Sequence, residues 1–125
     1  MSEKQRVVRW LIWGTCVLVW TFCLVTTYPV HAGRAVLAQA ADFPVSKVLH
    51  VVSYAFLTVL SAWLQVRGLW RWLLLVFLVL HGAATEFIQQ WVPERTGSVR
   101  DVLLDCVGIG IGFALTWRWW VRPER

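Results

Sequence analysis

The chain has 125 residues, of which 58% are apolar, with ten tryptophans and a formal net charge of +5. A soluble globular domain is about 45–50% apolar, so this composition excludes an ordinary soluble domain and predicts a membrane protein. The basic residues lie at the ends of apolar segments, where they orient a chain in the bilayer, and nucleic-acid binding is not expected. Because most of the chain is apolar, residues 1–125 are predicted to form a single membrane domain.

Four segments are long and apolar enough to cross a membrane, since a helix needs about 20 mostly apolar residues to span roughly 30 Å of hydrocarbon. In chain order they are Val7–Tyr28, Lys47–Val66, Trp70–Val92 and Val99–Val121. Four strands cannot close a barrel, and open sheet edges are not tolerated in lipid. The sequence therefore predicts an all-α, polytopic integral membrane protein with four transmembrane helices.

The first segment also has features of a signal peptide, because it follows the basic stretch "MSEKQRVVRW" and precedes "VHA" at Val30–Ala32. Its apolar part is longer than the roughly 7–15 residues of a signal-peptide core. A retained span is the expected interpretation. Cleavage would leave three spans in the same orientation.

Basic residues are distributed unequally between the two sides of the predicted bundle. One side holds Lys4, Arg6, Arg9, Arg67, Arg71, Arg118, Arg122 and Arg125, and the other holds Arg34, Lys47, Arg95 and Arg100. Cytoplasmic loops carry the excess of Lys and Arg, so both termini are predicted to be cytoplasmic. Eight tryptophans lie near the same side, as an interfacial belt would: Trp10, Trp13, Trp63, Trp70, Trp72, Trp117, Trp119 and Trp120.

Three of the predicted helices carry polar residues near their extracytoplasmic ends. These are Lys47, His50 and Tyr54 on the second, Glu86 with Gln89 or Gln90 on the third, and Asp101 and Asp105 on the fourth. Spacings of three and four place each set on one helical face. An ionised group below the membrane interface is costly unless it is paired or faces water. We therefore predict that the three sets converge on one polar pocket facing the extracytoplasmic side.

Two glycines of "GIGIG", Gly108 and Gly112, have the spacing of a close-packing helix face. They continue the Asp101–Asp105 face inward along the same helix. This face is therefore predicted to contact protein instead of lipid, and a homo-oligomer formed through the two glycines is one such contact.

The segments "KVLHVVSYAFL" and "ATEFIQQWVPERTGSVRDVLLDCVGIGIG" resemble the VanZ-like family of small bacterial membrane proteins, over residues 47–112. The resemblance implies recurrent polar positions at Lys47, His50, Tyr54, Glu86, Gln89, Arg95, Ser98 and Asp101. Two positions depart from the family pattern: Ser46 stands where Asp is common, and Asp105 stands where Asn is usual. The resemblance implies location in the bacterial cytoplasmic membrane. It also suggests a link to the cell envelope, since one member is tied to reduced teicoplanin sensitivity.

Several polar residues also have purely structural interpretations. His50 is a hydrogen-bonding residue at the helix end, a general base or a metal ligand, and Asp101 is equally well a first-turn acid capped by Ser98. Arg95 either anchors its loop at the interface or binds phosphate or carboxylate through its planar donors. His31 is not expected in the site because it lies in the first outer loop, and His81 is not expected there because 81 and 86 differ by five and do not fall neatly on one face.

Three classes of function remain. The first, favoured here, is binding or protection of a lipid-linked cell-wall precursor, a polyprenyl phosphate or a lipoglycopeptide-related ligand. Its binding residues are Lys47, Tyr54, Gln89, Gln90, Arg95, Ser98 and Arg100. The second is a hydrolase or transferase acting on a lipid-linked phosphate, with acid–base chemistry or a divalent cation at His50, Glu86, Asp101 and Asp105. The third is a proton-coupled carrier subunit. The lipid bilayer is the expected surrounding, and neither a cofactor nor a set of metal ligands is assigned from the sequence alone.

Overall fold

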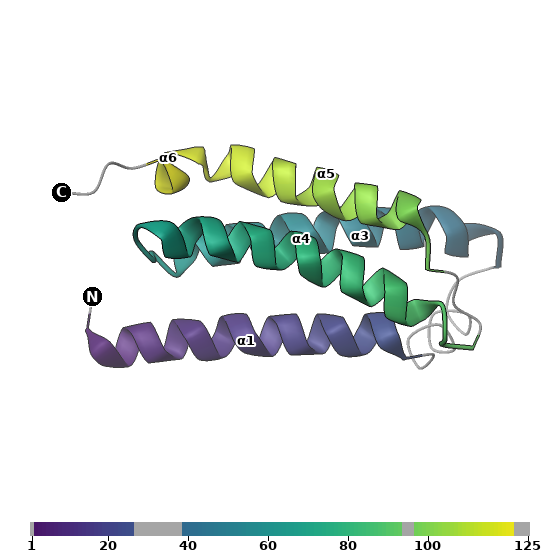
Figure 1. The fold of residues 1–125 in the computed structure, drawn as a ribbon, viewed down its shortest axis with the longest axis horizontal. Coiled ribbons are helices and arrows are strands. Elements are labelled where there is room, and N and C mark those ends of the chain that lie inside the picture. Colours follow the sequence, from purple (N-terminus) through teal and green to yellow (C-terminus); the bar gives the residue numbers. More distant parts are fainter. Residues whose placement is uncertain (1, 27–38, 94–96, 122–125) are drawn as a thin grey trace.

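The computed structural model describes residues 2–26, 39–93 and 97–121, and within these ranges it contains helices and no strand. The helices are α1 (Glu3–Val25), α3 (Gln39–Trp63), α4 (Leu69–Gln89), α5 (Val99–Leu115) and the short α6 (Trp117–Trp120). The predicted all-α fold is confirmed. In Figure 1, α3 and α4 lie between α1 and α5, and the start of α1, the α3–α4 turn and α6 share one end of the bundle.

The surface of the bundle is apolar, whereas much of its interior is polar. Large side chains such as Leu18, Leu80 and Leu103 are at least 60% exposed, while Thr58, Thr85 and Asp105 are buried. A soluble protein avoids such extended exposed apolar surface. Lipid is therefore the solvent that suits this distribution, and the polar side chains find their partners between the helices.

Three helical segments are long and apolar enough to cross a membrane: Glu3–Val25, Ser46–Trp63 and Leu69–Gln89. They correspond to the first three predicted spans. The fourth predicted span, Val99–Val121, is divided in the structure, because α5 has 17 residues and ends at Leu115. Thr116 accounts for this break. Its hydroxyl donates to the Gly112 carbonyl at 2.6 Å and accepts the Trp120 indole N–H at 2.7 Å.

Two of the eight tryptophans expected at the interface belong to the core. Trp13 is buried and its indole nitrogen donates to the Ser61 hydroxyl at 2.8 Å, joining α1 to α3. Trp120 is only 2% exposed, because α6 turns its ring inward. A polar partner between helices satisfies an indole N–H as well as the interface does, so position near a helix end does not by itself place a tryptophan at the surface.

Helix α3 begins at Gln39, well before the predicted start at Lys47. Its apolar, membrane-compatible part nevertheless begins at Ser46, close to the prediction. Pro44 explains the difference, because proline inside a helix removes a hydrogen bond and normally indicates a boundary. Hydropathy located the most apolar part of this helix and missed its first turns.

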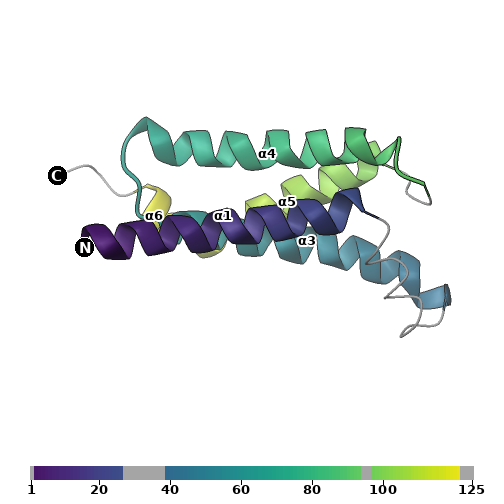
Figure 2. The same ribbon diagram turned by 90° about the horizontal axis from the view of Figure 1, so that it is seen from below.

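The closest helix pair is α3 and α5, which run along each other in both views (Figures 1 and 2). A Cβ atom added at Gly108 would overlap the Val51 carbonyl oxygen, and one at Gly112 would lie 2.6 Å from Thr58 Cβ. Both glycines therefore pack against α3 of the same chain, so the predicted contact of this face with protein is present, and a homo-oligomer stays a prediction. This close approach sets the distance between the polar residues of α3 and α5.

Arginine side chains close the end of the bundle where α1 begins. Arg9 donates to the Trp63 carbonyl oxygen at 2.7 Å, and Arg71 donates to the Trp120 carbonyl oxygen at 2.7 Å. Both acceptors are carbonyl groups at helix C-termini, which lack a partner within the helix. These bonds join α1 to α3 and α4 to α6, leaving the polar residues of the opposite end to form the site.

Candidate functional site

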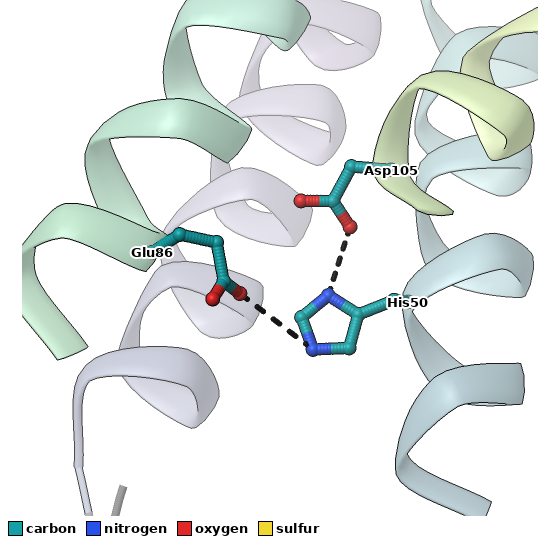
Figure 3. Close-up of side chains that lie close together, drawn as sticks. All are labelled: His50, Glu86 and Asp105. Carbon is teal, nitrogen blue, oxygen red and sulfur yellow. Dashed lines mark hydrogen bonds and ion pairs between the residues drawn. The ribbon is translucent and has the colours of Figure 1, made fainter. Parts of the chain in front are cut away.

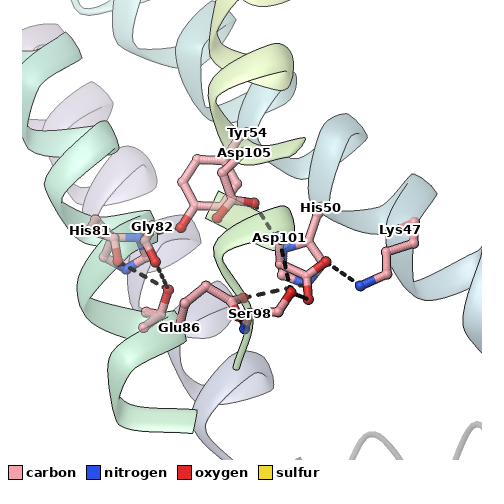
Figure 4. A network of polar contacts seen from close by, with 10 residues as sticks. Lys47, His50, Tyr54, His81, Gly82, Glu86, Ser98, Asp101 and Asp105 are labelled. Atoms are coloured by element: carbon pink, nitrogen blue, oxygen red, sulfur yellow. Dashed lines mark hydrogen bonds and ion pairs between the residues drawn. The ribbon is translucent and has the colours of Figure 1, made fainter. Parts of the chain in front are cut away.

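The predicted convergence of three polar faces is present at the end of the bundle where α4 ends and α5 begins (Figure 4). Helix α3 contributes His50 and Tyr54, α4 contributes Glu86 and Gln89, and α5 contributes Asp101 and Asp105. All six side chains are buried, and Lys47 and Ser98 at the edge are partly buried. We call these eight residues the polar cluster.

His50 lies at the centre of the cluster, between two carboxyl groups (Figure 3). Its Nδ1 is 2.8 Å from Asp105 Oδ1, a hydrogen-bond distance, and its Nε2 is 3.8 Å from Glu86 Oε1. The second distance is too long for a hydrogen bond. The imidazole is thus held firmly by Asp105, while its other nitrogen faces Glu86 across a gap.

The second carboxylate oxygen of Glu86 is hydrogen-bonded to the start of α5. Its Oε2 accepts the backbone N–H of Ser98 at 2.8 Å. A Cβ atom at Gly97 would overlap the Glu86 carbonyl oxygen, so the chain entering α5 passes directly against α4. Glu86 Oε2 is therefore fixed by the backbone, and Oε1 is directed towards His50.

Asp101 connects the start of α5 to α3. Ser98 is the N-cap of α5, accepting the Asp101 N–H at 3.2 Å and donating its hydroxyl to Asp101 Oδ2 at 2.9 Å. Asp101 Oδ1 forms an ion pair with Lys47. The predicted N-cap is confirmed, and an acid in the first turn also suits the helix dipole. Asp101 therefore has a structural role even though it lies in the site.

Sequence reasoning missed His81, which joins three helices. Its Nε2 is 2.8 Å from Thr21 Oγ1 on α1, and its Nδ1 is 2.8 Å from the Tyr54 hydroxyl. The Thr21 hydroxyl already donates its proton to the Val17 carbonyl, so Nε2 of His81 is the donor in the bond to Thr21. Neutral imidazole carries one N–H, and Tyr54 consequently donates to Nδ1. His81 thus orients Tyr54.

Gly82 is a second residue that the sequence did not indicate. A Cβ atom there would lie 2.8 Å from Asp105 Oδ2 and 3.3 Å from the Tyr54 hydroxyl oxygen. Its position four residues before Glu86, on the same helical face, is the signal that could have indicated it. Because Gly82 has no side chain, there is room beside it for the Asp105 carboxylate.

Two of the predicted site residues that the structure describes are not part of the cluster. Gln90 and Arg100 are exposed, so of the two candidate glutamines on α4 it is Gln89 that turns inward. Arg95 lies outside the described residues, as does His31. The described site therefore has Lys47 as its cation and no arginine.

Several polar atoms of the cluster are not used by the fold. Among the described residues, the buried atoms without a hydrogen-bond partner are Trp20 Nε1, Glu86 Oε1, Gln89 Nε2 and Asp105 Oδ2. Buried polar groups are nearly always hydrogen-bonded, so each exception requires an explanation. Three of these four atoms belong to the polar cluster, so the unpartnered buried groups of the described residues are concentrated there.

An apolar groove of about 260 Å³ runs between α1 and α3. It is lined by Thr15, Cys16, Val19, Trp20, Ser53, Phe56 and Leu57. Trp20 belongs to both features, since its ring packs edge-on against His50 with 6.3 Å between the ring centroids. Val19 and Phe56 of the lining are more than half exposed, so the groove lies at the apolar surface of the bundle, and Trp20 connects it to the polar cluster.

The fold and the site together define a helical membrane protein with a buried polar site between three helices. A family model described as VanZ/LLP1 matches residues 5–121, and the chain belongs to this family. The resemblance inferred from residues 47–112 is thereby confirmed, and it extends over nearly the whole chain. Comparisons with curated proteins and with solved structures gave no significant match.

Proposed function

We propose that this protein binds the head group of a lipid-linked component of the bacterial cell envelope in the polar cluster. The three unpartnered buried atoms of the cluster, Glu86 Oε1, Gln89 Nε2 and Asp105 Oδ2, carry this proposal. An unpaired polar group in a low-dielectric surrounding costs free energy. Hydrogen bonds to a polar head group would offset this cost. Lys47 adds a positive charge at the edge of the cluster, where phosphate or carboxylate of the ligand would arrive.

In this proposal the cluster faces the extracytoplasmic side and both termini are cytoplasmic. Helix α5 and the following α6 make the fourth crossing. An α-helix of 17 residues is about 26 Å long, close to the roughly 30 Å of hydrocarbon, and α6 continues to the level of the arginine contacts. The uneven distribution of basic residues supports this orientation.

The groove between α1 and α3 supplies the place for the hydrocarbon chain of the same ligand. It is apolar, it opens towards the surrounding lipid, and Trp20 forms its boundary with His50. A lipid with its head group in the cluster would therefore lie with its first chain segment in the groove. Because the chain is already out of water in the bilayer, van der Waals packing in the groove is what this segment adds to the affinity.

Native mass spectrometry of the protein in nanodiscs tests the proposal. The probes are a lipid-linked cell-wall precursor and a polyprenyl phosphate, with an uncharged polyprenol as the control ligand. We expect wild type to retain the charged lipids selectively, and Lys47→Ala and Arg95→Ala to weaken retention. Glu3→Gln, which changes an exposed carboxylate on α1, is the matched control variant. Equal retention of all three lipids by wild type contradicts the proposal.

A second candidate is hydrolysis or transfer at the lipid-linked phosphate, and the position of His50 favours it. An imidazole held by one carboxylate and facing another is arranged to accept a proton from a water molecule or a hydroxyl group. Asp105 then orients the ring, and Glu86 lies where the attacking group would be bound. The products of a hydrolysis would be the lipid alcohol and the released phosphate.

The same spectra distinguish the two functions. If the protein is an enzyme, the mass of the bound lipid changes with time. His50→Ala and Glu86→Gln then abolish the change while the unaltered lipid is still retained. If the protein only binds, the mass stays constant in every variant, and Lys47→Ala has the largest effect on retention.

A further inference from the structure

The charges of the polar cluster do not balance. Its described side chains include three carboxyl groups, on Glu86, Asp101 and Asp105, and one ammonium group, on Lys47. Lys47 is paired with Asp101, which leaves Glu86 and Asp105 around His50. Two buried carboxylates with one imidazole between them make a site of negative potential, which attracts a cation.

The two carboxylates each have one oxygen that the fold does not use. Glu86 Oε1 and Asp105 Oδ2 have no hydrogen-bond partner among the described residues, and their side chains are 3% and 1% exposed. The remaining oxygens, Glu86 Oε2 and Asp105 Oδ1, accept from Ser98 N–H and pair with His50 Nδ1. Each carboxylate is therefore oriented by one oxygen and presents the other inside the cluster.

The separations suit a metal ion. One ligand atom from each of His50, Glu86 and Asp105 can be chosen so that all three lie within 4.8 Å of one another. His50 Nε2 and Glu86 Oε1, 3.8 Å apart, fit two ligands of one ion, because metal–ligand bonds of about 2.1 Å place such atoms at most about 4.2 Å apart. The Asp105 ligand atom lies within 4.8 Å of the other two, so a small movement of its side chain is needed to complete the set.

We propose that His50, Glu86 and Asp105 bind one divalent transition-metal ion. One imidazole and two carboxylates are ligands typical of Zn²⁺ and Mn²⁺, whereas Mg²⁺ favours oxygen ligands alone. Ser98 N–H orients Glu86 in the way that outer hydrogen bonds orient metal ligands. Gly82 contributes the space next to Asp105 Oδ2 that a side chain would fill. Three protein ligands leave a further coordination position open.

The metal site is a proposal beyond head-group binding and does not depend on it. If both hold, the positive charge of the metal ion explains how an acidic cluster accepts an anionic head group. A metal ion held by the three residues bridges to phosphate oxygen, as divalent cations do in phosphate-binding sites. Lys47, at the edge of the cluster, then contacts the other side of the same group.

Metal content and metal affinity test the proposal without any lipid. The full chain, purified in detergent without a polyhistidine tag, is treated with a chelator and then titrated with Zn²⁺, Mn²⁺ or Mg²⁺ by calorimetry. Elemental analysis after desalting gives the stoichiometry. We expect one equivalent of Zn²⁺ or Mn²⁺ in wild type and binding at least about 100-fold weaker in Glu86→Gln and Asp105→Asn. These two substitutions keep size and remove charge. Glu3→Gln should bind as wild type.

Co²⁺ spectroscopy keeps the test decisive if one variant is unstable. Co²⁺ bound through nitrogen and oxygen gives visible absorption bands, which Zn²⁺ should abolish by competition in wild type. His50→Ala should remove the bands, and rescue by imidazole added to that variant would assign the nitrogen ligand. Wild type that takes up less than about 0.2 equivalents of every metal overturns the proposal, as does equal uptake by all variants. Lipid retention by metal-free protein would then leave head-group binding intact.

Discussion

At the level of single residues, the site depends on a glycine, Gly82, as well as on charged side chains. A Cβ atom at Gly82 would lie 2.8 Å from Asp105 Oδ2, so Asp105, which is buried and bonded to His50, must shift. Gly82→Ala should therefore lower the free energy of unfolding by about 1–3 kcal/mol, as overpacking does, less the roughly 1 kcal/mol by which alanine favours a helix over glycine. The displaced Asp105 should weaken metal uptake and lipid retention at least about 10-fold. Calorimetry and native mass spectrometry measure both effects.

Gly110→Ala is the matched control for this substitution, because nothing lies within 4 Å of a Cβ atom at Gly110. It should bind metal and lipid as wild type does. If Gly82→Ala also binds normally, the position of Asp105 is not important for the site.

A substitution at Ser98 tests the attachment of α5 to the site. Ser98→Ala removes the cap on Asp101 N–H and the hydroxyl bond to Asp101 Oδ2. Loss of a serine N-cap costs about 1 kcal/mol, so the midpoint of thermal unfolding in detergent should fall. Ser98→Thr keeps the hydroxyl group, which caps Asp101 N–H and donates to Asp101 Oδ2, and should recover stability. No difference between the alanine variant and wild type would show that the cap does not stabilise α5.

The site residues that sequence reasoning found share one property: each is polar or charged within an apolar run. His50, Glu86 and Asp105 are conspicuous in this way, and helical spacing was sufficient to put each on an inward face. His81 and Gly82 were missed because their roles depend on contacts between helices. Only the structure shows that Thr21 of α1 and Tyr54 of α3 meet at His81.

At the level of helices, the contact between α3 and α5 determines the width of the site. The nearest atom to a Cβ at Gly108 is a backbone oxygen, that of Val51, which cannot move without shifting α3. Overpacking of this kind typically costs about 1–3 kcal/mol. Gly108→Ala should therefore lower the free energy of unfolding by that amount, as measured by denaturant titration in detergent micelles. Gly110→Ala again serves as the control and should not be destabilised.

Helix α1 has a different role, since with α3 it forms the groove proposed for the lipid chain. Val19→Trp fills the groove from α1 and should lower retention of a polyprenyl phosphate at least about 10-fold while leaving metal uptake unchanged. Leu18→Trp places the same bulk on the neighbouring residue, which is 70% exposed and outside the groove lining. Equal retention by the two variants would remove the groove from the lipid-binding proposal.

Helix existence and approximate position could be predicted from hydropathy, whereas helix ends could not. The first three spans match, because apolar composition alone defines them. The break at Thr116 depends on its hydrogen bonds to Gly112 and Trp120, and the early start of α3 at Gln39 depends on turns that tolerate Pro44. Local contacts of this kind have no signature in average hydropathy.

For the whole molecule, the arrangement of the two ends leads to a prediction of topology. The start of α1, the α3–α4 turn and α6 share one end, with the polar cluster towards the other (Figures 1 and 4). Basic residues are concentrated at the first end, where Arg9 and Arg71 close the bundle. Cytoplasmic retention of basic residues therefore predicts that the polar cluster opens to the outside.

Cysteine labelling in intact cells measures this orientation. The natural Cys16, Cys23 and Cys106 are first replaced by alanine, and single cysteines are introduced at exposed positions of each end. We expect a membrane-impermeant maleimide to label Gln90→Cys and Arg100→Cys in intact cells. Gln65→Cys and Arg67→Cys, at the α3–α4 turn, should react only after permeabilisation. The reverse pattern would place the cluster in the cytoplasm and exclude extracytoplasmic head groups as its ligands, whereas a metal ion could still reach it.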